Sequence, residues 1–167
     1  ARTGCGATTR SDRMTEGSTE QAGGPGPEHR RLDVFVGRWN TQGVVRATAD
    51  APEFRFTATD VYEWMAGGFF LLHHVDAQMG DARLTALEVI GYDAATGTYP
   101  MRSFDSTGST GTHVATLRDG VWTFTGASER FTGTFSDDGG TITGLWERSD
   151  DGAAWEPWMD ITLTRES

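Results

Sequence analysis

Two histidines stand side by side at positions 73 and 74, in a run rich in leucine, valine and phenylalanine. Imidazole is the side chain that exchanges a proton most readily near neutral pH, and a neighbouring carboxylate tunes it for acid–base chemistry. Adjacent residues of a strand point to opposite faces of a sheet. If this run is a strand of a closed barrel, we expect one of the two histidines to face the interior.

Counting outward from the centres of the next two predicted turns pairs His73 with a carboxylate. Turn centres at 80–81 and at Ala95 set His73 opposite Glu88 and Glu88 opposite Arg102. This register predicts a ladder of His73, Glu88 and Arg102 on one face. The same ladder on the outer surface would be a cross-strand ionic pair of small energetic worth.

The opposite face carries a second candidate group. The same register places His74 near Leu87 and Ser103, and brings Asp105 and His113 toward each other across the following turn. We take His74, Asp105 and His113 as the candidate catalytic residues and the His73 ladder as the alternative. A slip of one residue exchanges the two faces, so the sequence does not choose between them.

The residue pattern does not predict a metal ion or a cofactor. His73 and His74 cannot reach one ion from opposite faces, and the single cysteine, Cys5, lies in a segment that we expect to be disordered. The glycine-rich runs resemble hairpin turns, because none opens a helix after a strand as a phosphate-binding loop does. We therefore expect no metal, no cofactor and no nucleotide.

Strands must position these side chains. From Leu32 onward, short runs of Val, Phe, Thr, Trp and Ile alternate with Gly and Asp clusters typical of tight turns. The candidate strands are 39–48, 53–63, 68–77, 84–92, 98–105, 112–118, 121–126, 130–136, 141–148 and 155–164. Consecutive hairpin-linked strands close most naturally into an all-β, single antiparallel up-and-down barrel, here of about ten strands. A short helical turn is expected at Pro27 to Phe35, and a β-sandwich is the alternative architecture.

Composition sets the domain organisation and excludes several partners. Residues 1–28 are Gly, Ser, Thr and Pro with few large apolar side chains, which predicts a disordered tail before one domain at 29–167. A net charge of −10 disfavours nucleic acid and anionic membrane surfaces. No apolar run reaches the roughly 18 residues of a membrane span, and no signal-peptide core is present, so we expect a cytoplasmic protein.

Aromatic residues suggest what the barrel holds. A barrel of about ten strands is wider than one whose side chains fill it, so interior space should remain. Aromatic walls with few polar anchors are typical of sites for apolar or aromatic molecules, although each tryptophan could instead be core packing. In the last strand, Met159, Ile161 and Leu163 share a face that we expect to be apolar and packed. The predicted ligand-binding residues are Trp39, Trp64, Phe70, Trp122, Trp146, Trp158 and Asp160.

Several motifs resemble a known group of barrels. Gly37-Arg38-Trp39 is the Gly-x-Trp found at the first strand of calycins, which include lipocalins, fatty-acid-binding proteins and nitrobindin-like barrels. Together with Gly67-Gly68-Phe69-Phe70, the segment 91–99 and the final Asp160–Arg165, it resembles an uncharacterised bacterial family of calycin-like barrels over roughly Leu32 to Arg165. The resemblance implies the fold but no particular activity. No histidine follows His113, where nitrobindins carry their axial haem ligand, so it does not extend to haem binding.

Three functions follow as hypotheses. The first is binding of a small apolar or aromatic molecule in the cavity, as a carrier or sensor. The second is a cofactor-independent isomerase or cyclase that uses a histidine–carboxylate pair in the same cavity. The third is a homodimeric interaction module with a packed barrel.

Overall fold

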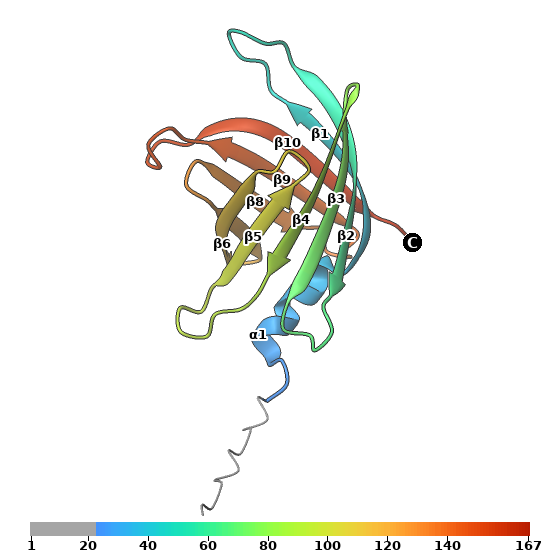
Figure 1. The fold of residues 1–167 in the computed structure, drawn as a ribbon, viewed down its shortest axis with the longest axis vertical. Coiled ribbons are helices and arrows are strands. Elements are labelled where there is room, and N and C mark those ends of the chain that lie inside the picture. Colours follow the sequence, from blue (N-terminus) through green and yellow to red (C-terminus); the bar gives the residue numbers. More distant parts are fainter. Residues whose placement is uncertain (1–22) are drawn as a thin grey trace, which may run out of the picture.

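Ten antiparallel strands close into a barrel in the computed structural model, which describes residues 23–167 (Figure 1). Each strand pairs with its neighbours in sequence, and the first pairs with the last. The strands are β1 (Gly37–Val45), β2 (Phe54–Trp64), β3 (Leu71–Met79), β4 (Ala82–Ile90), β5 (Tyr99–Asp105), β6 (Thr110–Arg118), β7 (Val121–Thr125), β8 (Glu129–Phe135), β9 (Thr141–Arg148) and β10 (Glu156–Arg165). The predicted all-β, up-and-down barrel is confirmed.

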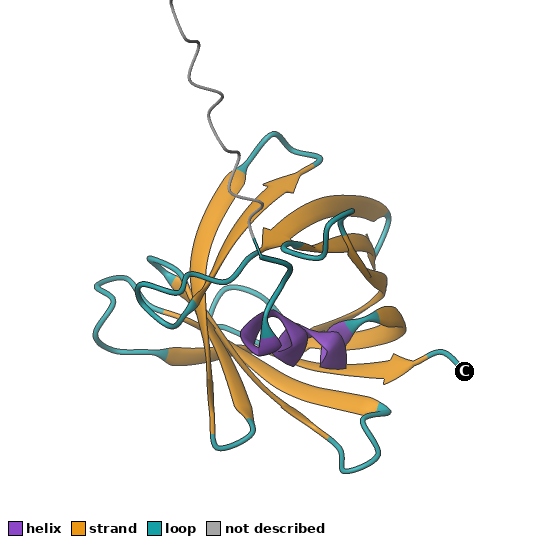
Figure 2. Ribbon diagram, turned by 90° about the horizontal axis from the view of Figure 1, so that it is seen from below, coloured by secondary structure: helices purple, strands orange, loops and turns teal. Residues whose placement is uncertain are grey.

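Two short helical segments lie across one end of the barrel, as Figure 2 shows from that side. They are α1 (Pro27–Arg30) and the 3₁₀ segment η1 (Arg31–Phe35), so the predicted helical turn is also confirmed. Proline suits the first helical position because its fixed φ matches the helix and its missing N–H leaves no bond unmade. We call this end of the barrel the plug end, and the opposite end, where the β1–β2 and β3–β4 hairpins project, the hairpin end.

Aromatic packing and hydrogen bonds hold the plug in place. The Phe35 ring lies 5.4 Å from Tyr62 and 5.3 Å from Trp122. Trp39 Nε1 donates a 2.7 Å hydrogen bond to the carbonyl oxygen of Phe35. The Arg165 guanidinium lies 4.1 Å from the centre of the Trp39 ring, and it also donates to backbone carbonyls at the end of the plug. The Gly-x-Trp tryptophan therefore ties β1 to the plug.

Most of the predicted tail, residues 1–22, lies outside the described residues. Cys5 is among these residues. The part of the chain that the structure describes contains no helix of the length and hydropathy needed to cross a membrane.

Candidate functional site

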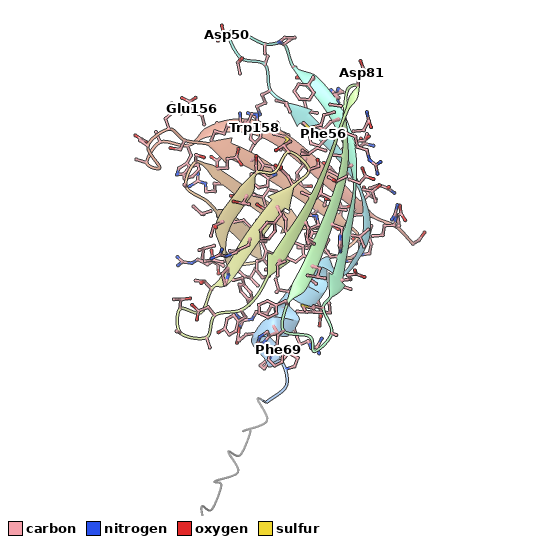
Figure 3. The ribbon with its side chains drawn as sticks, viewed as in Figure 1. Asp50, Phe56, Phe69, Asp81, Glu156 and Trp158 are labelled. Atoms are coloured by element: carbon pink, nitrogen blue, oxygen red, sulfur yellow. The ribbon has the colours of Figure 1, made fainter. Side chains whose placement is uncertain are left out.

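The barrel encloses a cavity of about 340 Å³ between the plug and the hairpin end. Its walls are almost entirely apolar. Toward the hairpin end it is bordered by half-buried side chains, among them Phe56 and Trp158, which Figure 3 labels at the end opposite α1. The lining residues are Phe35, Phe56, Ala58, Asp60, Tyr62, His73, Val75, Ala77, Met79, Leu84, Ala86, Glu88, Ile90, Met101, Phe124, Phe131, Trp146, Trp158, Met159, Ile161 and Leu163.

The ionisable groups of the cavity form one line across three strands. His73 on β3 is 8% exposed and lies between two carboxylates. Its Nε2 lies 2.8 Å from Asp60 Oδ1 on β2, and its Nδ1 lies 2.7 Å from Glu88 Oε2 on β4. Both ring nitrogens donate when the imidazole is protonated, so each carboxylate then accepts one hydrogen bond.

Strand register brings these residues together. His73 pairs directly with Tyr62 on one side and with Glu88 on the other. Asp60 lies two residues before Tyr62 on β2, so it faces the same side of the sheet and reaches His73 diagonally. Asp60, Tyr62, His73 and Glu88 therefore all face the interior.

The protonated form of His73 is strongly favoured. Burial alone lowers the pKa of His73, but the charge of Glu88 and the hydrogen bonds to both carboxylates outweigh burial and raise that pKa from 6.5 to about 9. The imidazole is therefore an imidazolium at neutral pH. It is not a free base, because both nitrogens already donate to carboxylates.

Tyr62 covers the face of the imidazole. The two rings are parallel within 7° and their centres are 3.8 Å apart, an arrangement that favours a cationic ring over an aromatic face. Burial, with the charges of Asp60 and Glu88, holds the pKa of the Tyr62 hydroxyl well above its usual range. Tyr62 therefore stays neutral and adds no negative charge to the line.

The two carboxylates differ in what remains free. Asp60 uses both oxygens, since Oδ2 accepts a hydrogen bond from the hydroxyl of buried Thr41 and Oδ1 faces His73. Glu88 uses Oε2 for His73, and its Oε1 has no hydrogen-bond partner within residues 23–167. Glu88 is also the more exposed of the two, with 19% of its side chain accessible against 7% for Asp60. Glu88 is thus the cavity-lining carboxylate of the line that keeps one oxygen, Oε1, without a hydrogen bond in the described residues.

Two glycines on the barrel wall leave room for two aromatic rings. A methyl group on Gly43 of β1 would overlap the ring of Phe56, and one on Gly144 of β9 would overlap the ring of Phe131. Each ring therefore occupies the space beside a glycine of the neighbouring strand, and both rings line the cavity.

The structure brings together two members of the predicted His73 ladder and leaves the third outside. The pairing of His73 with Glu88 is confirmed. Glu88, however, pairs with Ser103, whereas Arg102 pairs with Val89 and is exposed on the outer face, so the predicted position of Arg102 is wrong. The reason lies in the β4–β5 turn. Its bridge partners are Asp93 and Thr98, so the centre of the turn lies half a residue beyond Ala95 and shifts the pairing by one residue. A catalytic role for this group stays a prediction.

The His74, Asp105 and His113 group is dispersed. His74 lies on the outer face, with Nε2 3.4 Å from Glu63, and both side chains are about half exposed or more. Asp105 serves its own turn: hydrogen bonds from the Thr107 hydroxyl and then from backbone N–H groups hold the pKa of Asp105 below its usual range. His113 lies beside Trp146, with ring centres 6.1 Å apart. No hydrogen bond or ion pair joins these three residues in the described part of the chain.

Two of the seven predicted ligand-binding residues line the cavity, namely Trp146 and Trp158. Met159, Ile161 and Leu163 share the predicted apolar face, which lines the cavity, whereas Asp160 lies on the outer face, paired with Arg46 through two hydrogen bonds, so its predicted binding role is wrong. The remaining predicted residues lie elsewhere. Trp39 and Trp122 are buried near the plug, Trp64 donates a hydrogen bond to Asp33 of η1, and Phe70 is 48% exposed.

Asp60, Tyr62 and Thr41 are site residues that the sequence analysis missed. A usable signal was present, because centring the β2–β3 turn between Gly67 and Gly68 sets Tyr62 opposite His73, as observed. Within residues 23–167, no three His, Cys, Asp or Glu side chains are arranged to hold a metal ion.

Comparison with known proteins establishes the family and supports the fold. Residues 24–129 match a family described as "Protein of unknown function (DUF1579)". The crystal structure of Rv2717c from M. tuberculosis is similar, with a TM-score of 0.64 and 13% identity over 85% of this chain and 99% of that one. No curated protein matches the sequence. Because the family match spans more than half of the sequence, the chain belongs to the DUF1579 family.

Proposed function

We propose that the protein binds a small, largely apolar molecule in the barrel cavity. The observation that carries the proposal is an apolar cavity of about 340 Å³ whose ionisable groups are gathered in the single line Asp60–His73–Glu88. That volume lies within the range of small-molecule sites, and such sites combine apolar walls with a few convergent polar groups. The cavity also argues against the alternative of a packed barrel that acts only as a dimerisation module.

The barrel is of the calycin-like kind in this proposal. The Gly-x-Trp segment at the start of β1 places Trp39 against the plug, where it bonds to Phe35. An up-and-down barrel closed at one end and lined by apolar side chains suits the carriage or sensing of a ligand.

Titration with the neutral fluorophore N-phenyl-1-naphthylamine tests the proposal. We expect saturable binding at one site per chain, and native mass spectrometry should detect the one-to-one complex. Absence of saturable binding by this probe, and of any co-purified small molecule, would contradict the proposal.

Two tryptophans three residues apart provide a matched pair for this titration. Trp155 and Trp158 are both half-buried and both lie beneath an arginine, Arg130 and Arg148 respectively, but only Trp158 lines the cavity. Trp158→Ala should weaken binding about tenfold, equivalent to about 1.4 kcal/mol of lost contact. Trp155→Ala should leave the affinity unchanged.

Catalysis in the same cavity is the second candidate, favoured by the free oxygen of Glu88. This carboxylate is fixed by His73 and presents Oε1 without a protein partner in the described residues. It would remove a proton from a carbon of the bound molecule and return it at another carbon, which isomerises the substrate with no change in protons or electrons. A ligand that co-purifies should then take up deuterium from D₂O with the wild type and not with Glu88→Gln.

A further inference from the structure

The charges around the cavity are not balanced. His73 supplies one positive charge between two carboxylates, Asp60 and Glu88, so the line carries one net negative charge. No arginine or lysine is among the described residues that line the cavity, and Tyr62 is neutral. The surplus charge therefore faces an otherwise apolar space.

We propose that the cavity selects a cationic ligand, an apolar or aromatic amine, whose ammonium group pairs with Glu88 Oε1. This inference rests on the proposed function and specifies the chemistry of its ligand. Each oxygen of Asp60 already accepts a hydrogen bond, from Thr41 or from His73, whereas Glu88 is more exposed and keeps one oxygen without a partner in the described residues, so we take Glu88 as the carboxylate that a ligand meets.

The physical reason is the cost of an unpaired charge in an apolar environment. A carboxylate without a partner in such a site is unfavourable, and an ammonium group that donates to it forms a charge-assisted hydrogen bond. A ligand carboxylate would instead add a second surplus negative charge to the same space. The apolar part of the amine would lie against the aliphatic and aromatic wall toward Phe56 and Trp158.

The charge of the whole chain acts in the same direction. The sequence carries a net charge of −10, which raises the local concentration of small cations around the protein and lowers that of anions. Long-range attraction and the local pairing at Glu88 thus favour the same class of ligand.

Three naphthalene derivatives of similar size and different charge test the proposal: 2-naphthylmethylamine, 2-naphthylmethanol and 2-naphthoate. Their affinities are measured at pH 7 by displacement of N-phenyl-1-naphthylamine from the full chain. We expect the amine to bind at least tenfold more tightly than the alcohol, and the carboxylate to bind most weakly. Raising the salt concentration should reduce the advantage of the amine only slightly, because the pair is buried.

Glu88→Gln removes the charge and keeps the shape, so it should abolish the preference for the amine over the alcohol. Glu63→Gln is the matched control, since Glu63 is a carboxylate on the outer face of β2 and should leave all three affinities unchanged. Thermal unfolding of each variant checks that it is folded. If Glu88→Gln does not fold, the order in which the wild type binds the amine, the alcohol and the carboxylate decides whether the cavity selects a cation.

The outcomes separate the two proposals. Equal binding of the three compounds, or tightest binding of the carboxylate, overturns the inference about charge and leaves the cavity-binding function standing. If no compound and no fluorophore binds, both proposals fail. A preference for the amine that survives in folded Glu88→Gln also overturns the inference, because the charge responsible would then lie elsewhere.

Discussion

The two ends of the barrel interior use the same kinds of side chain for different purposes. At the plug end, Trp39 and Trp122 are each 2% exposed or less and do not line the cavity, and Phe35, 3% exposed, packs on Trp122 and closes the cavity at that end. At the hairpin end, Phe56 and Trp158 are half-buried and border free space. Aromatic content therefore does not distinguish a core from a ligand wall. What differs is the presence of η1, which supplies the side chains that complete the packing at one end only.

The largest expected effect tests whether the plug end is truly core. Phe35→Ala removes a ring that contacts Tyr62, Trp122, Phe124 and Phe135, and should lower the free energy of unfolding by about 4 kcal/mol in urea denaturation. Trp158→Ala, at the other end, should cost about 1 kcal/mol because it borders space that is already empty. Equal losses from the two substitutions would erase the distinction between the ends.

The pH dependence of the free energy of unfolding tests the His73 line, and the expected effect lies between those of Phe35→Ala and Trp158→Ala. The pKa of His73 is raised from 6.5 to about 9 in the folded state, so its stabilisation is complete below pH 6.5 and is lost as the pH rises through 9. The free energy of unfolding should fall by about 3 kcal/mol between pH 6 and 10. The same decline should persist in His74→Gln, whose histidine is on the outer face, and should be absent in His73→Gln. A wild type with constant stability over this range would contradict the buried imidazolium.

The smallest effect concerns how the plug is attached to the barrel wall. Trp64 Nε1 on β2 donates a 2.7 Å hydrogen bond to Asp33 Oδ1 of η1. Asp33→Ala should lower stability by about 1 kcal/mol, whereas Asp33→Asn keeps an acceptor oxygen and should lose about half as much or less. Equal losses in the two variants would indicate that the hydrogen bond contributes nothing and that only the charge of Asp33 matters.

The sequence predicted the fold well because the relevant signals are local. Glycine and aspartate clusters mark the turns, and every predicted strand overlaps an observed one by most of its length. Alternation alone predicts that Met159, Ile161 and Leu163 share an apolar face of the last strand, but a bulge between Pro157 and Met159 lets Trp158 line the cavity as well.

The site was harder to predict because it depends on register between strands. His73 was correctly set opposite Glu88, since the β3–β4 turn is a tight one centred at 80–81. Half a residue of error in the next turn moved Arg102 from the outer face to the inner one. Asp60 is harder to predict because it reaches His73 diagonally, so its place depends on the register across the β2–β3 turn as well as on alternation. Aromatic residues of the packed core and of the cavity wall follow the same sequence pattern. Only three-dimensional packing therefore shows that Trp122 belongs to the core and that Trp146 lines the cavity.

Gly43 and Gly144 influence the width of the barrel cavity. Because the rings of Phe56 and Phe131 rest on these bare stretches of backbone, a single added methyl group at either glycine would push a whole ring toward the axis. Substitutions at these two glycines, even ones that add no polar group, can thus reduce the cavity volume without touching the Asp60–His73–Glu88 line. Members of the family that share the charged line but carry alanine at these positions would accept narrower molecules. Ligand size and ligand charge would then vary independently, the first set by absent side chains and the second by one carboxylate.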